Sequence, residues 1–132
     1  MHERIETIDD PRLDVFRNLK ARNSVRDARL FVAEGVTVVE RVLRSPLLVQ
    51  SVLVSDRKFA TCEQFLPPGV CVLRLRSELA DELVGFSFHC GVMACAVRPE
   101  NPNVDSWIPG RGSSLIVAAD RVVDPENAGA LI

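Results

Sequence analysis

The sequence is poor in several residue types and patterns that mark particular protein classes. It has no tyrosine and one tryptophan, and no apolar run approaches the roughly 18 residues that a membrane-spanning helix needs. The first ten residues are charged and lack the apolar centre of a signal peptide. Four cysteines occur without a C-x-x-C pair, and no G-x-G-x-x-G fingerprint is present. We therefore expect a cytoplasmic protein with reduced, buried cysteines, no metal ion and no membrane contact.

The net charge of −2 does not indicate a strongly basic nucleic-acid binder, but the charges are unevenly distributed. Residues 1–60 contain 11 Lys and Arg against 9 Asp and Glu, whereas residues 61–132 contain 5 against 9. A basic run between positions 17 and 29 holds a single acid; its basic residues are Arg17, Lys20, Arg22, Arg26 and Arg29. Such a run is commonly a solvated face, yet guanidinium groups also suit phosphates. Both interpretations stay open on composition alone.

Strand and helix patterns alternate along the first hundred residues. Short apolar segments predict four strands, at 29–35, 51–55, 70–75 and 91–97. Apolar residues at helical spacing predict the intervening helices, at 36–45, 57–65 and 77–84. This alternation predicts a three-layer α/β/α domain that spans residues 1–98.

Signals at the ends of two of these helices are specific. A first helix is predicted to begin with Asp10 as its N-cap and Pro11 in its first turn, with Leu13 and Phe16 on its apolar face. The helix at 77–84 is predicted to have Ser77 as its cap and to end at Gly85.

A change in composition follows the predicted domain. Residues 99–114 are rich in proline, glycine and serine, which indicates a linker. An apolar strand is then predicted at 115–119, and Asp124 and Pro125 can open a helix behind it. The amides near Asn127 would lie at a helix start, where phosphate and carboxylate groups bind; an ordinary capped turn is the other reading.

Three segments resemble the SpoU-type (TrmH-like) RNA 2′-O-ribose methyltransferases of the knotted SPOUT superfamily. The stretch "LIVAADRVVDPENAGALI" is similar to their first signature motif, which contains Asp-Pro-x-Asn-x-Gly-x-Ile. The matching positions are Asp120, Asp124, Pro125, Asn127, Gly129 and Ile132. "LFVAEGVTVVERVL" and "FHCGVMACAVRP" resemble segments of the substrate-binding domain that precedes it.

The resemblance implies a reaction and a division of labour along the chain. The implied activity is methyl transfer from S-adenosylmethionine to a ribose 2′-hydroxyl of ribosomal or transfer RNA. Residues 1–98 would be the RNA substrate-binding domain, similar to small ribosomal proteins that bind RNA bends, and 115–132 the start of a truncated knotted methyltransferase domain. The family's catalytic arginine would follow directly after Ile132, so Asn127 is the catalytic residue expected in this chain, and no cofactor-binding residue is expected. Homodimerisation through the knotted domain is also implied.

Structured RNA is thus the expected partner. The candidate contacts are the basic residues Arg17, Lys20, Arg22, Arg26 and Arg29 for phosphates, and His89 for stacking on a base. Two alternatives remain: a stand-alone RNA-binding module without catalytic activity, and a nucleotide-binding α/β enzyme cut after its first strand and turn.

Overall fold

The computed structural model describes residues 2–17, 29–100 and 103. The chain divides into two units, Met1–Pro99 and Glu100–Ile132, and the second contributes only Glu100 and Asn103 to the described residues. The expectations for 115–132, including the strand at 115–119, therefore lie outside the described residues. The elements of the first unit are β1 (His2–Arg4), η1 (Pro11–Phe16), β2 (Leu30–Glu34), α2 (Val36–Arg44), β3 (Val49–Ser55), α3 (Asp56–Cys62), η2 (Glu63–Phe65), β4 (Val72–Leu75), α4 (Ser77–Val84) and β5 (Val92–Val97).

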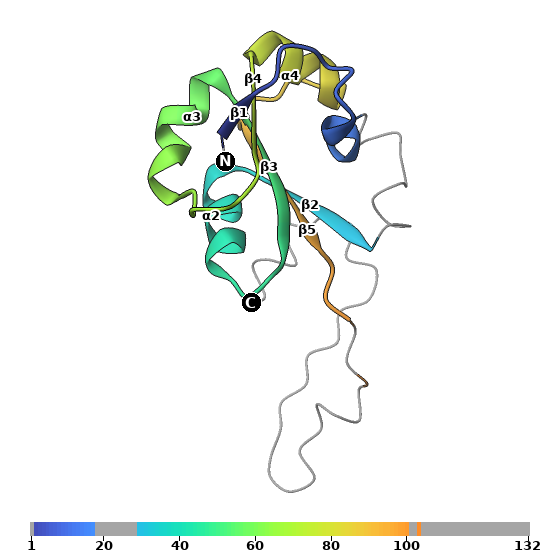
Figure 1. Ribbon diagram of the computed structural model, residues 1–132, viewed down its shortest axis with the longest axis vertical. Coiled ribbons are helices and arrows are strands. Elements are labelled where there is room, and N and C mark those ends of the chain that lie inside the picture. The colour runs from blue at the N-terminus through green and yellow to red at the C-terminus, as the bar shows by residue number, and fades with distance from the viewer. Residues whose placement is uncertain (1, 18–28, 101–102, 104–132) are drawn as a thin grey trace, which may run out of the picture. The chain divides into compact units, whose positions relative to one another are not determined.

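The strands form one mixed sheet in the order β1-β4-β3-β5-β2. β4 pairs in parallel with both β1 and β3, whereas β5 is antiparallel to both of its neighbours, β3 and β2. β1 to β4 consequently all run in one direction, and β5 alone runs the other way (Figure 1). The carboxyl ends of four strands and the amino end of the fifth therefore meet at one edge.

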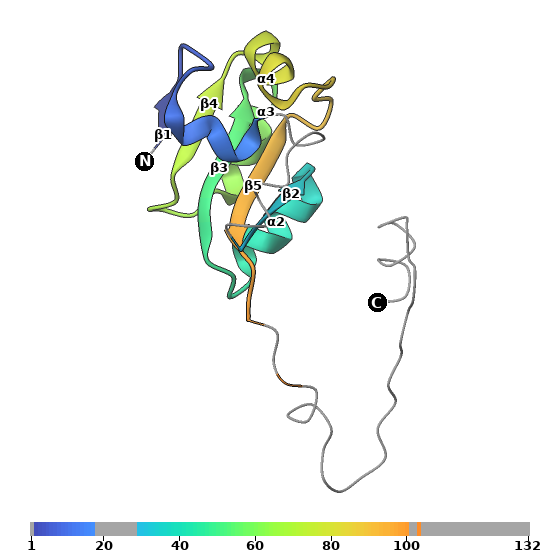
Figure 2. The same ribbon diagram turned by 90° about the vertical axis from the view of Figure 1, so that its right-hand side faces the viewer.

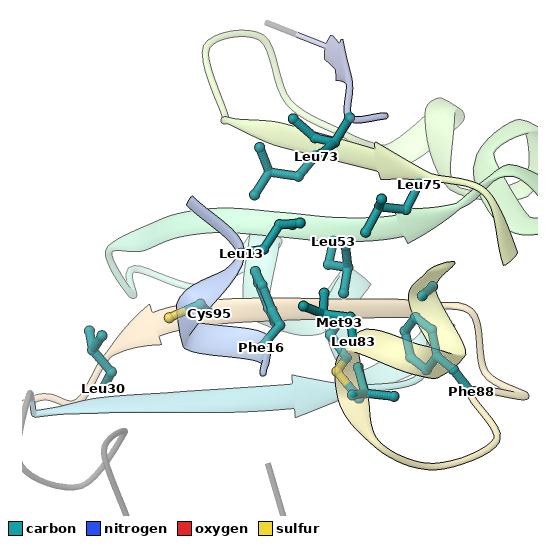
Figure 3. Close-up of a cluster of buried hydrophobic side chains, with 13 residues drawn as sticks. Leu13, Phe16, Leu30, Leu53, Leu73, Leu75, Leu83, Phe88, Met93 and Cys95 are labelled. Atoms are coloured by element: carbon teal, nitrogen blue, oxygen red, sulfur yellow. The ribbon is translucent and has the colours of Figure 1, made fainter. Parts of the chain in front are cut away.

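Helical elements cover both faces of this sheet (Figure 2). Successive residues of a strand point to opposite faces, so on β3 Leu53 joins one apolar cluster while Val52 and Val54 join the other. The first cluster packs under η1 and α4, and it contains most of the large side chains (Figure 3). The second packs under α2 and α3 and is rich in valine. The α/β architecture predicted from the sequence is confirmed, with helical layers on both sides of the sheet.

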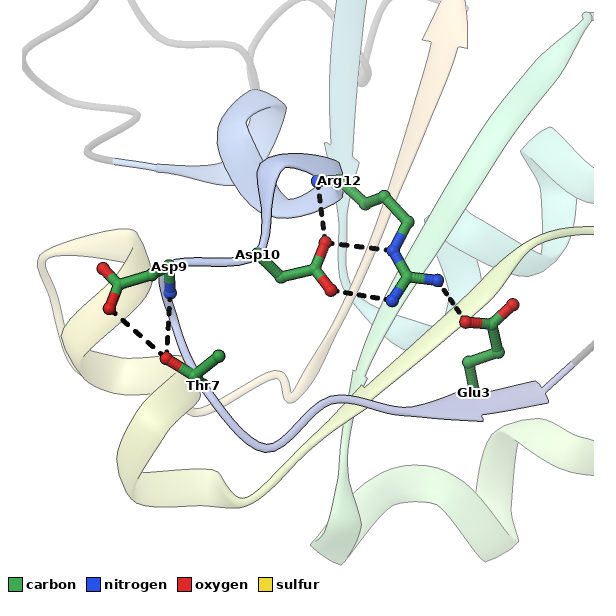
Figure 4. Close-up of polar contacts among 5 residues, drawn as sticks. All are labelled: Glu3, Thr7, Asp9, Asp10 and Arg12. Carbon is green, nitrogen blue, oxygen red and sulfur yellow. Dashed lines mark hydrogen bonds and ion pairs between the residues drawn. The ribbon is translucent and has the colours of Figure 1, made fainter.

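The short strand β1 was not predicted, because His2–Arg4 is charged and only three residues long. Polar contacts beside it help to hold it on the sheet (Figure 4). Arg12 bridges the carboxylates of Glu3 and Asp10, donating from Nη2 to Asp10 Oδ2 at 2.7 Å and from Nε to Asp10 Oδ1 at 2.9 Å. The Thr7 hydroxyl oxygen accepts from the amide of Asp9 at 3.2 Å in the turn between them. Side-chain and backbone hydrogen bonds from Arg12 lower the pKa of Asp10 to about 2. The side-chain hydrogen bonds of Arg12 to Asp10 and Glu3 raise the pKa of Arg12.

Two helix expectations need correction. Asp10 does cap η1, accepting from the amide of Arg12 at 2.9 Å, and Leu13 and Phe16 are fully buried. However, η1 is a six-residue 3-10 helix rather than the start of a longer α-helix, and Arg17 is already extended. Ser77 does not cap α4, because the extended residue before it, Arg76, occupies that position and places Ser77 in the first turn.

The cysteines are less uniformly buried than expected. All four are free thiols; Cys62 and Cys95 are buried, Cys71 is half-buried, and Cys90 is exposed. Burial raises the thiol pKa of Cys62 and of Cys95. Cys90 differs because it belongs to the loop that enters β5, so its side chain is not enclosed by either face of the sheet.

Candidate nucleic-acid interface

The edge where β1 to β4 end and β5 begins collects polar groups from distant parts of the sequence. Backbone hydrogen bonds tie its neighbouring segments together: the Ser55 amide donates to the Gly91 carbonyl at 2.8 Å, and the Gly35 amide donates to the Val92 carbonyl at 3.1 Å. Open sheets that contain parallel strands commonly bind ligands at the carboxyl ends of those strands. This edge is therefore the first place to look for a binding site.

Basic side chains follow β3 and β4 at this edge. Arg57 and Lys58 lie in the first turn of α3, and Arg76 follows the last residue of β4. Arg57 and Arg76 are exposed and Lys58 is half-buried. Within residues 2–17 and 29–100, no carboxylate forms an ion pair with any of the three. Such cations are available to an anionic ligand.

Other cations nearby are already paired. Arg4 and Arg74 both contact the carboxylate of Asp56, Arg4 at 3.5 Å through Nη2. The guanidinium of Arg74 also lies over the ring of Phe59, 4.4 Å from its centroid. These pairings neutralise Asp56, a carboxylate in the first turn of α3 that would otherwise offset the positive charge of Arg57 and Lys58.

A loop between α4 and β5 carries the exposed imidazole of His89. The loop is anchored at its start: α4 ends on Gly85 in the left-handed conformation, and Asp81 Oδ1 accepts from the amide of Phe88 at 2.8 Å. The Phe88 side chain is 1% exposed and packs in the larger apolar cluster (Figure 3). The loop backbone is thus held both by a charge-assisted hydrogen bond and by a buried ring.

The end of the same loop packs tightly against α3. The Gly91 amide donates to the Phe88 carbonyl at 3.2 Å, and Gly91 has a φ of +65°. A Cβ atom on Gly91 would lie 2.5 Å from Lys58 Cγ and 2.6 Å from Ser55 Oγ, so only glycine fits. Lys58 is therefore held directly beside the loop that presents His89.

Cys90 is exposed on this loop but is not activated as a nucleophile. The pKa of its thiol is raised, mainly by desolvation and to a lesser extent by the charge and hydrogen bond of Glu34. The charge of Lys58 lowers this pKa by a smaller amount. A thiol with a raised pKa is mostly protonated at neutral pH, and the thiolate is the reactive form. The chemistry of this edge is consequently that of binding through cations and an aromatic ring.

Of the basic run at 17–29, the structure describes Arg17 and Arg29. Arg17 is half-buried and contacts Asp14 at 3.3 Å and the carbonyl oxygen of Ile8. Arg29 is exposed and precedes β2; its carbonyl accepts from the Arg98 amide at 2.7 Å, beyond the end of β5. Arg29 and His89 thus lie at opposite ends of β5. Four further predicted residues, Lys20, Arg22, Arg26 and Asn127, lie outside the described residues.

The sequence did contain a signal for Arg57, Lys58 and Arg76. Each follows a segment that was predicted as a buried strand, in "SVLVSDRK" and "VCVLRLR". A count of charges along the chain does not group them, because 17 residues lie between Lys58 and Arg76. The parallel pairing of β3 with β4 brings their carboxyl ends side by side.

Comparisons of sequence relate the chain to known proteins. No protein-family model matches it. It is 32% identical over 128 residues to an uncharacterized tRNA/rRNA methyltransferase of Mycobacterium tuberculosis, covering 93% of this chain and 44% of the relative. It is also 36% identical over 70 residues to the 23S rRNA (guanosine-2′-O-)-methyltransferase RlmB of Acinetobacter baylyi, covering 50% of this chain and 28% of that protein. The chain is thus similar in sequence to curated tRNA/rRNA methyltransferases. It spans less than half the length of the curated relatives that it matches.

Solved structures of RNA methyltransferases share the fold of this chain. An RNA 2′-O ribose methyltransferase superposes with a TM-score of 0.63 at 24% identity, covering 97% of this chain and 49% of that one. An AdoMet-bound rRNA methyltransferase from Sinorhizobium meliloti gives a TM-score of 0.58 at 15% identity, covering 76% and 38%. At these identities the likeness concerns the fold.

Proposed function

We propose that the whole protein is an RNA methyltransferase that transfers a methyl group from S-adenosylmethionine to a ribose 2′-hydroxyl of ribosomal or transfer RNA. The observation that carries this proposal is the similarity to the mycobacterial tRNA/rRNA methyltransferase along 93% of the chain. The motif match at Asp124, Pro125 and Asn127 and the name of the relative RlmB support the ribose position. The AdoMet-bound structural neighbour supports the methyl donor.

Within that protein, we assign residues 1–98 to holding RNA and 115–132 to the start of the knotted catalytic domain, with 99–114 as linker. Asn127 is the catalytic candidate in this chain, and the dimer would form through the knotted domain. We assign no described residue to S-adenosylmethionine, because the exposed groups singled out at the sheet edge, Arg57, Arg76 and His89, offer its sulfonium no carboxylate. No step of methyl transfer is therefore assigned to them.

The experiment uses the protein expressed from its complete reading frame. It is incubated with S-adenosylmethionine labelled in the methyl group and with ribosomal or transfer RNA from a strain that lacks the gene. The expected result is label in RNA, recovered as a 2′-O-methylated nucleoside after digestion and mass spectrometry. Asn127→Ala is expected to lower the rate while the protein still binds RNA.

Label on a base rather than on a ribose would refute the assignment of the 2′-hydroxyl. RNA binding without any incorporated label would favour the alternative, an RNA-binding module without catalytic activity. Absence of both would refute the proposed function as a whole.

A further inference from the structure

The cations at the sheet edge and the anchored loop lie at the same end of three neighbouring strands. We call the residues Arg57, Lys58, Arg76 and His89 the carboxyl-edge surface. From their charge and order we infer that this surface is an RNA-binding site of the chain, in which the three cations hold backbone phosphates and the imidazole stacks on an unpaired base. The inference rests on the proposed function and locates the RNA contact outside the basic run at 17–29.

The order of strands fixes the order of the groups along the edge. β4, β3 and β5 are consecutive neighbours, so Arg76, then Arg57 and Lys58, then His89 follow one another across the sheet. Adjacent strands lie about 4.8 Å apart, so the ends of the three strands that carry the set span roughly 10 Å. A short stretch of single-stranded RNA covers such a distance, with its phosphates on one side and its bases on the other.

The charges of the surrounding carboxylates orient the ligand. Asp56 is paired with Arg4 and Arg74, and Glu34, the last residue of β2, lies beside the thiol of Cys90. Phosphates are thereby favoured over the β3 and β4 side of the edge and disfavoured near β2. The imidazole of His89 lies between these regions, where an uncharged base meets no electrostatic penalty.

The rigidity of the loop favours stacking. Asp81 and the buried ring of Phe88 hold its start, and the close packing of Gly91 against Ser55 and Lys58 holds its end. A ring that is already positioned loses less conformational freedom on binding a base than a ring on a loose loop. Proteins commonly read single-stranded RNA by stacking its bases on such rings.

The test compares two double variants of the 132-residue chain with equal changes in net charge. Arg57→Ala/Arg76→Ala removes two cations of the carboxyl-edge surface. Arg41→Ala/Arg44→Ala removes two exposed cations from the last turn of α2, at the other end of the unit. Binding to fluorescently labelled bulk tRNA is measured by anisotropy across a series of salt concentrations, since phosphate contacts do not depend on sequence.

Each lost phosphate contact lowers the slope of log affinity against log salt by about 0.7 on single strands. Arg57→Ala/Arg76→Ala should therefore flatten the slope by about 1.4 and weaken binding about 25-fold at 0.1 M salt. The α2 pair should change affinity less than about threefold, because distant charges are screened within roughly 10 Å at this salt concentration. Arg57→Gln/Arg76→Gln repeats the test if the alanine variant melts early in circular dichroism.

His89 is tested separately because its contribution is not ionic. His89→Ala should weaken tRNA binding about tenfold with an unchanged salt slope, and His89→Phe should restore it, because either ring can stack. Suppose that the wild-type chain binds tRNA. Equal salt slopes for the two arginine double variants, or binding by His89→Phe as weak as by His89→Ala, would then overturn the inference. Absence of tRNA binding by the wild-type chain would instead refute the RNA-holding role together with this surface.

Discussion

Replacement of Gly91 by alanine tests the packing that joins the loop to α3. The new methyl group would have to occupy a position 2.6 Å from Ser55 Oγ and 2.5 Å from Lys58 Cγ, both inside van der Waals contact. The left-handed φ of +65° adds about 1–2 kcal/mol for any residue with a Cβ atom. Overpacking of a tight site costs about 1–3 kcal/mol more. We expect the free energy of unfolding to fall by about 3 kcal/mol in total, which lowers the Tm of a domain this size by roughly 12–24 °C.

Gly69→Ala is the matched control for this substitution. Gly69 has a φ of +89°, but a Cβ atom there would meet nothing within 4 Å, so only the backbone term of about 1–2 kcal/mol applies. Urea denaturation of both variants gives the difference that belongs to the contact. Adding Ser55→Ala to Gly91→Ala should recover part of that difference, because it removes a buried hydroxyl that has no hydrogen-bond partner among the described residues. Equal losses at positions 91 and 69 would show that the loop and α3 are not in close contact.

Two further predictions concern polar contacts that shape the unit. The carboxyl of Asp10 should titrate at about 2 in an NMR pH series and move up towards its ordinary value in Arg12→Ala. The folded pKa of Asp10 lies below the unfolded value, so its contribution to stability is present above about pH 4 and is lost as the pH falls through 2. Titration of Asp10 at its ordinary pKa in the wild type would contradict this. Asp81→Ala should lower the free energy of unfolding by about 1.5–3 kcal/mol and speed hydrogen exchange of the Phe88 amide, whereas Asp81→Asn, which keeps an acceptor oxygen, should retain most of the protection. Exchange of the Phe88 amide in Asp81→Ala at the wild-type rate would remove the carboxylate from the anchoring of the loop.

Local patterns were sufficient to predict most of the secondary structure. α2 follows the stripe of Val39, Val42 and Leu43. The four strands predicted within residues 1–98 all form, because their apolar residues are buried in the two clusters. β1 could not be found in this way, since it is held by pairing with β4 and by ion pairs rather than by its own apolar residues. The early end of η1 was also missed, because no glycine or proline marks the position of Arg17.

The site was predictable only in part. His89 could be chosen from its place at the entrance to a strand, and the structure finds it exposed on an anchored loop. The cations beside it depended on strand order, which one sequence does not contain. The guanidinium of Arg17, in contrast, contacts Asp14 and Ile8, contacts that a count of basic residues cannot reveal.

The position of β5 between β3 and β2 has a consequence for the time at which the unit can fold during synthesis. β2 pairs with β5, beginning with Leu30 opposite Val97. β5 also pairs with β3 on its other side. Until residue 97 has left the ribosome, β2 has no partner strand among the described residues and one edge of β3 is open. Long-range pairing of this kind folds slowly, and open apolar edges can pair with other chains. A nascent chain that stops within 92–97 should therefore be sensitive to protease and prone to aggregation, and completing this one strand should close the sheet in a single late step.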